Sequence, residues 1–312
     1  MAVANARLER MKQQFASGKI ILSDGAWATQ MQKLGLQPGD CPEEWNVSRP
    51  DNVRQIARDY LKVGADFCLT NTFGGNKYRL VRHGFADKMR EFNLLGALLS
   101  RQAADEVGAW VAGSVGPTGE FVQPEGMLAP NEMYAAFREQ IEALKEGGVD
   151  AVCIETMYVL DEALLAIKAA HDVGVFCIAC MTFDETPGGF KTMMGVELGE
   201  AAKALDASTA DVIGTNCGNG IDEMVKIAHT MRGLTKKPLM VKSNAGLPKV
   251  VHGISVYKET PQMMAARIAE LKAAGVAIVG GCCGTTPEYI RAFLSLIHIS
   301  EPTRLRRISY AV

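Results

Sequence analysis

Short apolar runs recur along the chain, and a segment with helical periodicity follows each of them. The runs are continuous rather than alternating, and they are rich in Val, Ile, Phe and Cys, which is typical of strands buried on both faces. Eight strands are predicted, at Ile20–Ser23, Phe67–Thr70, Trp110–Gly113, Ala151–Ile154, Phe176–Met181, Val212–Thr215, Leu239–Lys242 and Ala277–Val279. Amphipathic helices are predicted between them, among others at Pro50–Val63, Met133–Leu144, Leu160–Ala170, Ile221–Met231 and Pro261–Ala273.

This alternation of strand and helix continues without a break in composition. It predicts one α/β domain, a closed (β/α)8 barrel of the TIM type, over residues 1–294. The alternative is an open, doubly wound sheet. Such a sheet would place a GxGxxG turn after the first strand, whereas the chain has Ser23-Asp24-Gly25-Ala26 there.

The last segment, residues 295–312, departs from this pattern. Its sequence, SLIHISEPTRLRRISYAV, has no helical period and resembles translated sequencing-adapter sequence. We expect this tail to be non-native, with a disordered native tail as the alternative, and it carries no functional prediction.

Composition narrows the class of protein. The chain has 312 residues, of which 48% are hydrophobic, and a formal net charge of −2, so nothing favours a nucleic-acid partner. No uncharged apolar run reaches the length of a membrane span, and the polar N-terminus lacks the core of a signal peptide. We therefore expect a cytoplasmic protein without a membrane partner, whose eight cysteines are reduced.

Three cysteines follow predicted strands at the end where (β/α)8 enzymes gather their catalytic groups. They are Cys217, Cys282 and Cys283, the last two flanked by glycines. Three thiolates can hold a zinc ion and leave its fourth tetrahedral position open. The pattern alone leaves a second reading open, in which the three are small buried hydrophobic residues. No histidine is expected in the site.

Six motifs in order along the chain carry a resemblance that covers residues 18–293. They are SDGAWATQMQ, LTNTFGGNKYRL, GSVGPTGE, GTNCGNG, VKSNAGLP and GGCCGTTPEYIRAF. Together they resemble the homocysteine-binding zinc methyltransferases. That family includes the N-terminal module of cobalamin-dependent methionine synthase, the betaine–homocysteine methyltransferases and the S-methylmethionine-dependent enzymes. The resemblance implies Zn²⁺ held by Cys217, Cys282 and Cys283, with the homocysteine sulfur as fourth ligand and Asn244 as the ligand before substrate arrives.

The amino-acid end of homocysteine needs its own partners. Asp24 and Glu155 follow the first and fourth predicted strands, and the family pattern assigns carboxylates there to the substrate ammonium. The alternative for Asp24 is a turn residue before a glycine. Backbone N–H groups around Gly25–Ala26 and Thr72–Phe73 are the predicted partners of the substrate carboxylate.

Zinc coordination would deprotonate the homocysteine thiol, which could then accept a methyl group to give methionine. The motifs look closer to the methionine synthase module, so the predicted donor is methylcobalamin or a corrinoid protein supplied in trans. The first alternative is a self-sufficient enzyme that uses S-methylmethionine or betaine. The second is a zinc- or thiol-binding protein without catalysis, which an open zinc position disfavours.

Overall fold

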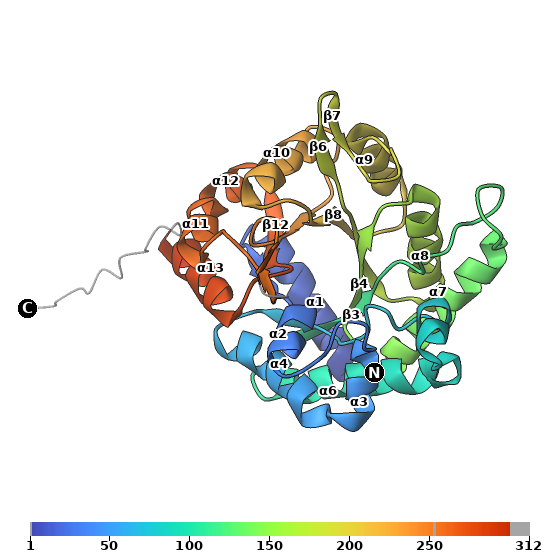
Figure 1. Cartoon of the computed structure of the whole chain (residues 1–312). Helices are drawn as coiled ribbons and strands as arrows, with labels where there is room; N and C mark the ends of the chain where they lie inside the picture. The colour runs from blue at the N-terminus through green and yellow to red at the C-terminus, as the bar shows by residue number, and fades with distance from the viewer. Residues whose placement is uncertain (1, 252–253, 300–312) are drawn as a thin grey trace, which may run out of the picture.

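Eight parallel strands form a ring in the computed structural model, which describes residues 2–251 and 254–299 (Figure 1). Neighbours in the ring follow the chain order, and the first strand pairs with the last. The prediction of a (β/α)8 barrel is therefore confirmed. The strands are β1 Ile21–Leu22, β2 Phe67–Leu69, β3 Trp110–Val115, β4 Ala151–Met157, β5 Phe176–Met181, β8 Val212–Cys217, β9 Leu239–Ser243 and β12 Val276–Gly281.

The seam between β1 and β2 is closed by aspartate side chains in place of a regular strand ladder. The N–H of Asp66 donates to the carbonyl oxygen of Leu22 at 2.7 Å, and the N–H of Leu22 donates to Oδ2 of Asp66 at 2.7 Å. Further along, the N–H of Leu69 donates to Oδ2 of Asp24 at 2.7 Å. Carboxylates thus satisfy the backbone donors that the very short β1 leaves unpaired.

Helices surround the ring, and all five predicted helices are present, although the predicted helix Pro261–Ala273 is divided in two at Arg267. Two short hairpins, β6–β7 (Asp184–Thr186, Gly189–Lys191) and β10–β11 (Lys249–Val251, Ile254–Val256), extend the loops after β5 and β9. The principal helices are α1 Ala2–Ala16, α4 Pro50–Lys62, α6 Met89–Asp105, α7 Pro130–Glu146, α8 Leu160–Val173, α9 Leu198–Ala207, α10 Ile221–Arg232, α11 Pro261–Ala266, α12 Ile268–Ala273 and α13 Pro287–Ile299.

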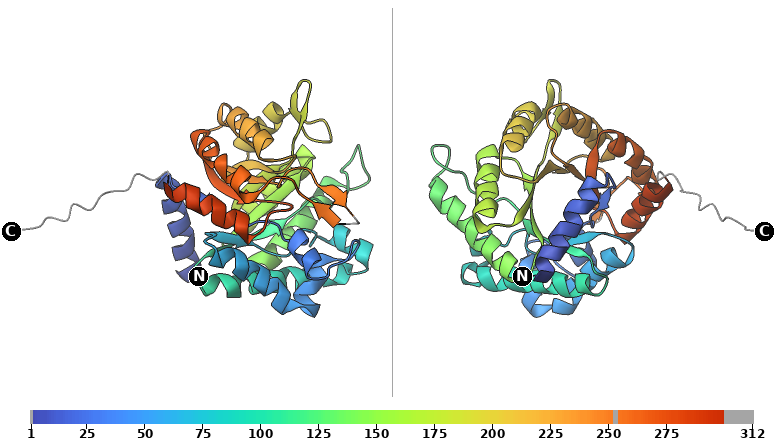
Figure 2. Two further views of the ribbon diagram at one scale, coloured as in Figure 1. Left: turned by 60° about the vertical axis from the view of Figure 1, so that its left-hand side comes forward. Right: turned by 180° about the vertical axis from the view of Figure 1, so that it is seen from behind.

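One end of the barrel is covered by α1. Figure 2 shows this helix lying across the barrel in the view from behind. Phe15 of α1 stacks on Phe176 at the start of β5, with ring centroids 6.0 Å apart, and Arg7 pairs with Asp150 just before β4 at 2.6 Å. Because these partners lie where strands begin, α1 closes the N-terminal end and leaves the opposite end for a site.

Several strands extend past their predicted ends, and two of these extensions reach site residues. β4 continues through Glu155 to Met157, and β8 continues to Cys217, so both site residues belong to strand ends rather than to loops. The predicted start of the tail, at residue 295, falls inside α13, while residues 300–312 lie outside the described residues. In the part of the chain that the structure describes, no helix has the length and apolarity needed to cross a bilayer.

Candidate metal and substrate site

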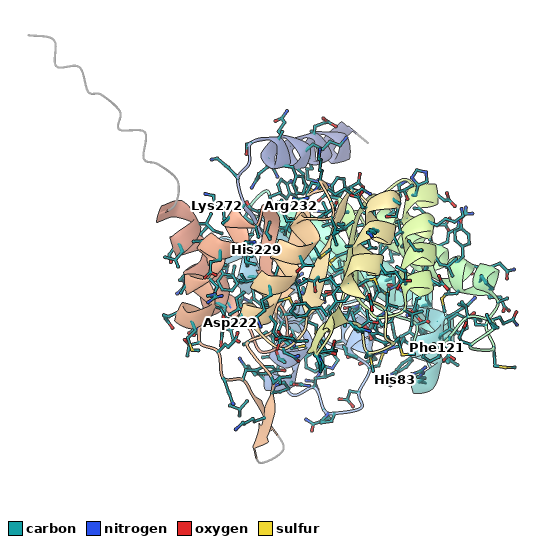
Figure 3. The ribbon with its side chains drawn as sticks, turned by 90° about the horizontal axis from the view of Figure 1, so that it is seen from above. His83, Phe121, Asp222, His229, Arg232 and Lys272 are labelled. Carbon is teal, nitrogen blue, oxygen red and sulfur yellow. The ribbon has the colours of Figure 1, made fainter. Side chains whose placement is uncertain are left out.

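A cavity of about 490 Å³ lies at the C-terminal end of the barrel. His83, which lines its mouth, lies at the barrel end opposite α1 (Figure 3). His83 thus lines the cavity, while the absence of histidine from the zinc and substrate ligands stays a prediction. The cavity walls contain all three predicted zinc ligands and five of the six predicted substrate residues, namely Gly25, Ala26, Thr72, Phe73, Glu155, Cys217, Cys282 and Cys283.

The three cysteine sulfur atoms form one cluster, all within 4.8 Å of one another. Cys217 ends β8, and Cys282 and Cys283 directly follow β12. The Sγ atoms of Cys217 and Cys282 are 3.7 Å apart. Two thiolates on a tetrahedral zinc ion with Zn–S bonds of about 2.3 Å lie about 3.8 Å apart, so this spacing fits a shared ion.

Glycines and one threonine shape the turn that carries the cysteine pair. A Cβ on Gly281 would lie 2.2 Å from Oγ1 of Thr285, so only glycine fits there. That Thr285 hydroxyl donates to the carbonyl oxygen of Cys282 at 2.7 Å and accepts from the N–H of Ala26 at 3.2 Å. The turn after β12 is thus tied to the turn after β1, which fixes the cysteine pair against the predicted substrate loop.

Asn244 lies between the two cysteine-bearing segments. Its N–H donates to the carbonyl oxygen of Cys217 at 3.2 Å, and its Nδ2 donates to the carbonyl oxygen of Gly218 at 2.6 Å. Its Oδ1 is buried and has no hydrogen-bond partner among the described residues. Buried polar atoms are nearly always partnered, so this unpaired oxygen, on a residue hydrogen-bonded to the backbone of Cys217, suits a ligand of a cation held by the cysteines.

The charge state of the thiols supports the same interpretation. Hydrogen bonds from Cys217 and Cys282 lower the pKa of Cys283 to about 3, whereas hydrogen bonding to Cys282 and Cys283 raises the pKa of Cys217 well above its ordinary value. Without a cation the cluster favours one thiolate over three. A divalent cation would compensate the charge of all three thiolates, and sulfur ligands favour a soft metal.

Left-handed backbone occurs at two non-glycine residues of the site. Thr156 in β4 has φ of 61°, and Cys217 at the end of β8 has φ of 69°. Asn216 links the two strands, because its Oδ1 accepts from the N–H of Thr156 at 2.7 Å and its Nδ2 donates to Oγ1 of Thr156 at 2.8 Å. Such conformations persist only where surrounding contacts hold them, and they concentrate at functional sites.

Glu155 is a buried carboxylate that faces the cavity. It is 7% exposed, and its Oε1 accepts from the hydroxyl of Ser114 at 2.5 Å. Burial raises the pKa of Glu155 to about 7, against an opposing effect of the nearby Lys242. Because Glu155 lines the cavity and forms no salt bridge among the described residues, its carboxylate could accept a cationic group of a ligand.

Asp24 is differently placed, because its carboxylate lies behind the cavity wall and is fully buried. Lys242 forms an ion pair with it at 2.9 Å. Burial alone would lower the pKa of Lys242, but Asp24 and Glu155 together raise it, so the lysine is a cation. The sequence analysis missed Lys242, because a lysine at the end of an apolar run reads as an ordinary strand terminus.

The predicted carboxylate-binding amides are partly available. The N–H of Ala26 is already used by Thr285, whereas those of Gly25, Thr72 and Phe73 have no acceptor in the described part of the chain. A Cβ atom added at Gly25 would lie 2.6 Å from Oγ1 of Thr285, so the loop is close-packed around these donors. Three free amides at one cavity suit a carboxylate.

Comparison with known proteins identifies the family of this chain. The family model for homocysteine S-methyltransferase matches residues 21–297. Methionine synthase of Mycobacterium tuberculosis is 32% identical over 315 residues, covering 94% of this chain and 26% of that protein. Methionine synthase of Mycobacterium leprae is 33% identical over 293 residues, covering 88% and 24%. The chain thus spans about a quarter of the length of these relatives.

Solved structures agree on the fold. The homocysteine methyltransferase MmuM from Escherichia coli, in its metallated form, superposes with a TM-score of 0.71 at 24% identity, covering 89% of this chain and 96% of that one. Polar groups and thiols at the C-terminal end of a (β/α)8 barrel stand where enzymes of this fold have their active sites. The chain belongs to the homocysteine S-methyltransferase family.

Proposed function

We propose that this barrel holds zinc at Cys217, Cys282 and Cys283 and transfers a methyl group to homocysteine, giving methionine. The carrying observation is the sulfur cluster, with 3.7 Å between Cys217 and Cys282, open to the same cavity as the unpaired carboxylate of Glu155. Before substrate arrives, Oδ1 of Asn244, which is buried without a hydrogen-bond partner in the described structure, would serve as the fourth ligand of the metal. Zinc, when bound, would supply Lewis acidity that lowers the pKa of a coordinated thiol.

The protein's own residues orient the substrate. Glu155 accepts the ammonium group, and the amides of Gly25, Thr72 and Phe73 donate to the carboxylate. These contacts direct the thiol end toward the cysteines, because all of these groups line one cavity. The homocysteine sulfur then forms a bond to the methyl carbon as the bond between that carbon and its donor breaks, and the thiol proton is released. Holding both partners in this geometry removes much of the entropic barrier.

For the methyl donor we propose a methylcorrinoid carried by a separate protein or domain. The sequence resembles the methionine synthase module, and the chain spans only a quarter of its methionine synthase relatives. A small sulfonium or quaternary ammonium donor would need an aromatic cage. The cavity lining includes two such rings, Trp27 and Phe73, and the ring of Phe73 already faces the guanidinium group of Arg79 at 5.9 Å.

One assay tests the proposal. Purified zinc-loaded protein is incubated with homocysteine and, in separate reactions, with methylcobalamin, S-methylmethionine or betaine, and methionine is quantified. We expect slow turnover with methylcobalamin and none with the other two donors. Fast turnover with S-methylmethionine or betaine alone would reverse the choice of donor. No methionine with any donor, together with no binding of homocysteine, would contradict the proposed reaction.

A further inference from the structure

The carboxylate of Asp24 has no acceptor position left for a substrate. Its Oδ1 accepts from Nζ of Lys242 at 2.9 Å and from the hydroxyl of Ser23 at 3.1 Å. Its Oδ2 accepts from Nε1 of Trp27 at 2.8 Å and from the N–H of Leu69 at 2.7 Å. A carboxylate offers about four lone-pair sites, and here four donors take them.

Lys242 is the one cation among these donors, and it lies 218 positions after Asp24 in the sequence. It lies in β9, its side chain is 2% exposed, and it reaches Asp24 across the wall of the cavity. Its ammonium group therefore occupies the place at Asp24 that a substrate ammonium would otherwise take. Because both partners are almost completely buried, the pair is fixed rather than exchanging with water.

Glu155 differs from Asp24 in each of these respects. It lines the cavity, it accepts one side-chain hydrogen bond, from Ser114, and it has no ion pair among the described residues. Of the two carboxylates, Asp24 thus has an ammonium partner in the protein and Glu155 has none among the described residues. An amino-acid substrate brings the second ammonium group and balances the charge at Glu155.

We propose that Lys242 is a positioning residue that withdraws Asp24 from substrate binding, so that the ammonium group of the substrate is held by Glu155 alone. This inference rests on the proposed homocysteine-binding function. It assigns the two carboxylates predicted from the sequence to different tasks. Asp24 with Lys242 builds the wall, and Glu155 recognises the ligand.

The test compares two ligands that differ in the ammonium group. Dissociation constants for homocysteine and for 4-sulfanylbutanoate, which lacks the amino group, are measured by calorimetry on zinc-loaded protein. The ratio of the two constants reports the ammonium contribution and cancels effects on zinc or on the thiol. It is measured for the wild type, for Glu155→Gln and for the double variant Asp24→Asn/Lys242→Met, which removes the buried pair as a unit.

We expect Glu155→Gln to reduce the preference for homocysteine by about tenfold to a hundredfold, the range for a lost charge-assisted hydrogen bond. The double variant should keep the preference within about threefold, because a buried ion pair replaced as a whole is often tolerated. Lys242→Met alone frees Asp24 to accept the ammonium group, so its preference for homocysteine should rise wherever the variant folds. A double variant that loses the preference as far as Glu155→Gln does would overturn the inference.

A matched control separates positioning from stability. Arg101→Met breaks another buried ion pair, with Asp150 at 2.8 Å, next to the N-terminal ends of the strands. It should lower the melting temperature without changing the ligand preference. If the wild type itself binds homocysteine no better than 4-sulfanylbutanoate, the proposed substrate is wrong, whereas an altered pattern in the variants with normal wild-type binding contradicts only the role of Lys242.

Discussion

The hydroxyl of Ser114, at the end region of β3, donates to Oε1 of Glu155 on the neighbouring strand β4 at 2.5 Å. This is the single side-chain hydrogen bond of Glu155 in the described part of the chain, where the carboxylate forms no salt bridge and only the nearby charge of Lys242 opposes the effect of burial. A buried acid with so little compensation makes the stability of the substrate-free protein depend on pH.

The first prediction follows from the sign of that dependence. Burial raises the pKa of Glu155 from 4.5 to about 7, so the folded state favours the protonated form. The contribution of Glu155 to stability is complete below pH 4.5 and is lost as the pH rises through 7. At one pKa unit per 1.36 kcal/mol, the loss by pH 8 is roughly 3 kcal/mol.

Urea unfolding of metal-free wild type and Glu155→Gln at pH 5 and pH 8 checks this value. The glutamine variant lacks the titrating group, so its free energy of unfolding should increase relative to that of the wild type as the pH rises. Homocysteine should reduce this difference in stability at pH 8, because its ammonium group stabilises the ionised carboxylate of the wild type. An equal stability difference at both pH values would show that Glu155 is ionised throughout or has other partners.

The second prediction concerns metal content. Purified protein should carry about one zinc per chain, because three thiolates and one open position make a single tetrahedral site. Cys282→Ala should lose the ion, since it removes the sulfur that contacts Cys217 at 3.7 Å. Cys177→Ala, a buried cysteine of β5, serves as the control and should retain zinc. Full zinc content in the triple alanine variant of the cluster would rule out the site.

The strands and the cysteine cluster could be predicted from the sequence, and the charge pairing could not. Buried parallel strands leave continuous apolar runs, and their ends meet at one side of a barrel, so Cys217 and Cys283 could be placed together in advance. The pair of Asp24 and Lys242 joins residues 218 positions apart through side-chain geometry alone. The same holds for Asp66, whose carboxylate closes the seam between β1 and β2 and leaves no local pattern in the sequence.

The third prediction concerns Asn244. Its buried Oδ1 has no partner in the described structure, and it is proposed to fill the metal position that homocysteine takes later. Asn244→Ala should therefore weaken zinc binding by about tenfold or more in the absence of homocysteine, a usual scale for lost support at a metal site. With homocysteine present, the affinity should return close to that of the wild type.

Chelator competition with and without homocysteine measures both values. Asn244→Asp keeps an oxygen donor in the same place and should bind zinc without substrate. The side chain also donates to the carbonyl oxygen of Gly218 at 2.6 Å. An equal loss in both conditions would show that Asn244 acts only through this structural hydrogen bond.

The last prediction concerns Gly284, which follows the cysteine pair. It has φ of 82°, and a Cβ there would lie 2.2 Å from Cγ of Tyr257. Gly284→Ala therefore combines left-handed strain with a collision against a ring. The ring cannot move away without shifting the segment after β11, so the turn that carries Cys282 and Cys283 should be displaced instead. We expect a lower melting temperature together with reduced zinc content.

Gly18 provides the matched comparison, since it has φ of 70° and no atom within 4 Å of its Cβ position. Gly18→Ala should cost about 1–2 kcal/mol, the strain of a left-handed residue with a side chain, and should keep its zinc. Gly284→Ala combined with Tyr257→Ala removes the collision but keeps the strain, so it should recover zinc binding and remain about as destabilised as Gly18→Ala. Zinc loss that persists in the double variant would mean that the backbone conformation of Gly284, rather than its packing against Tyr257, holds the cysteine pair in place.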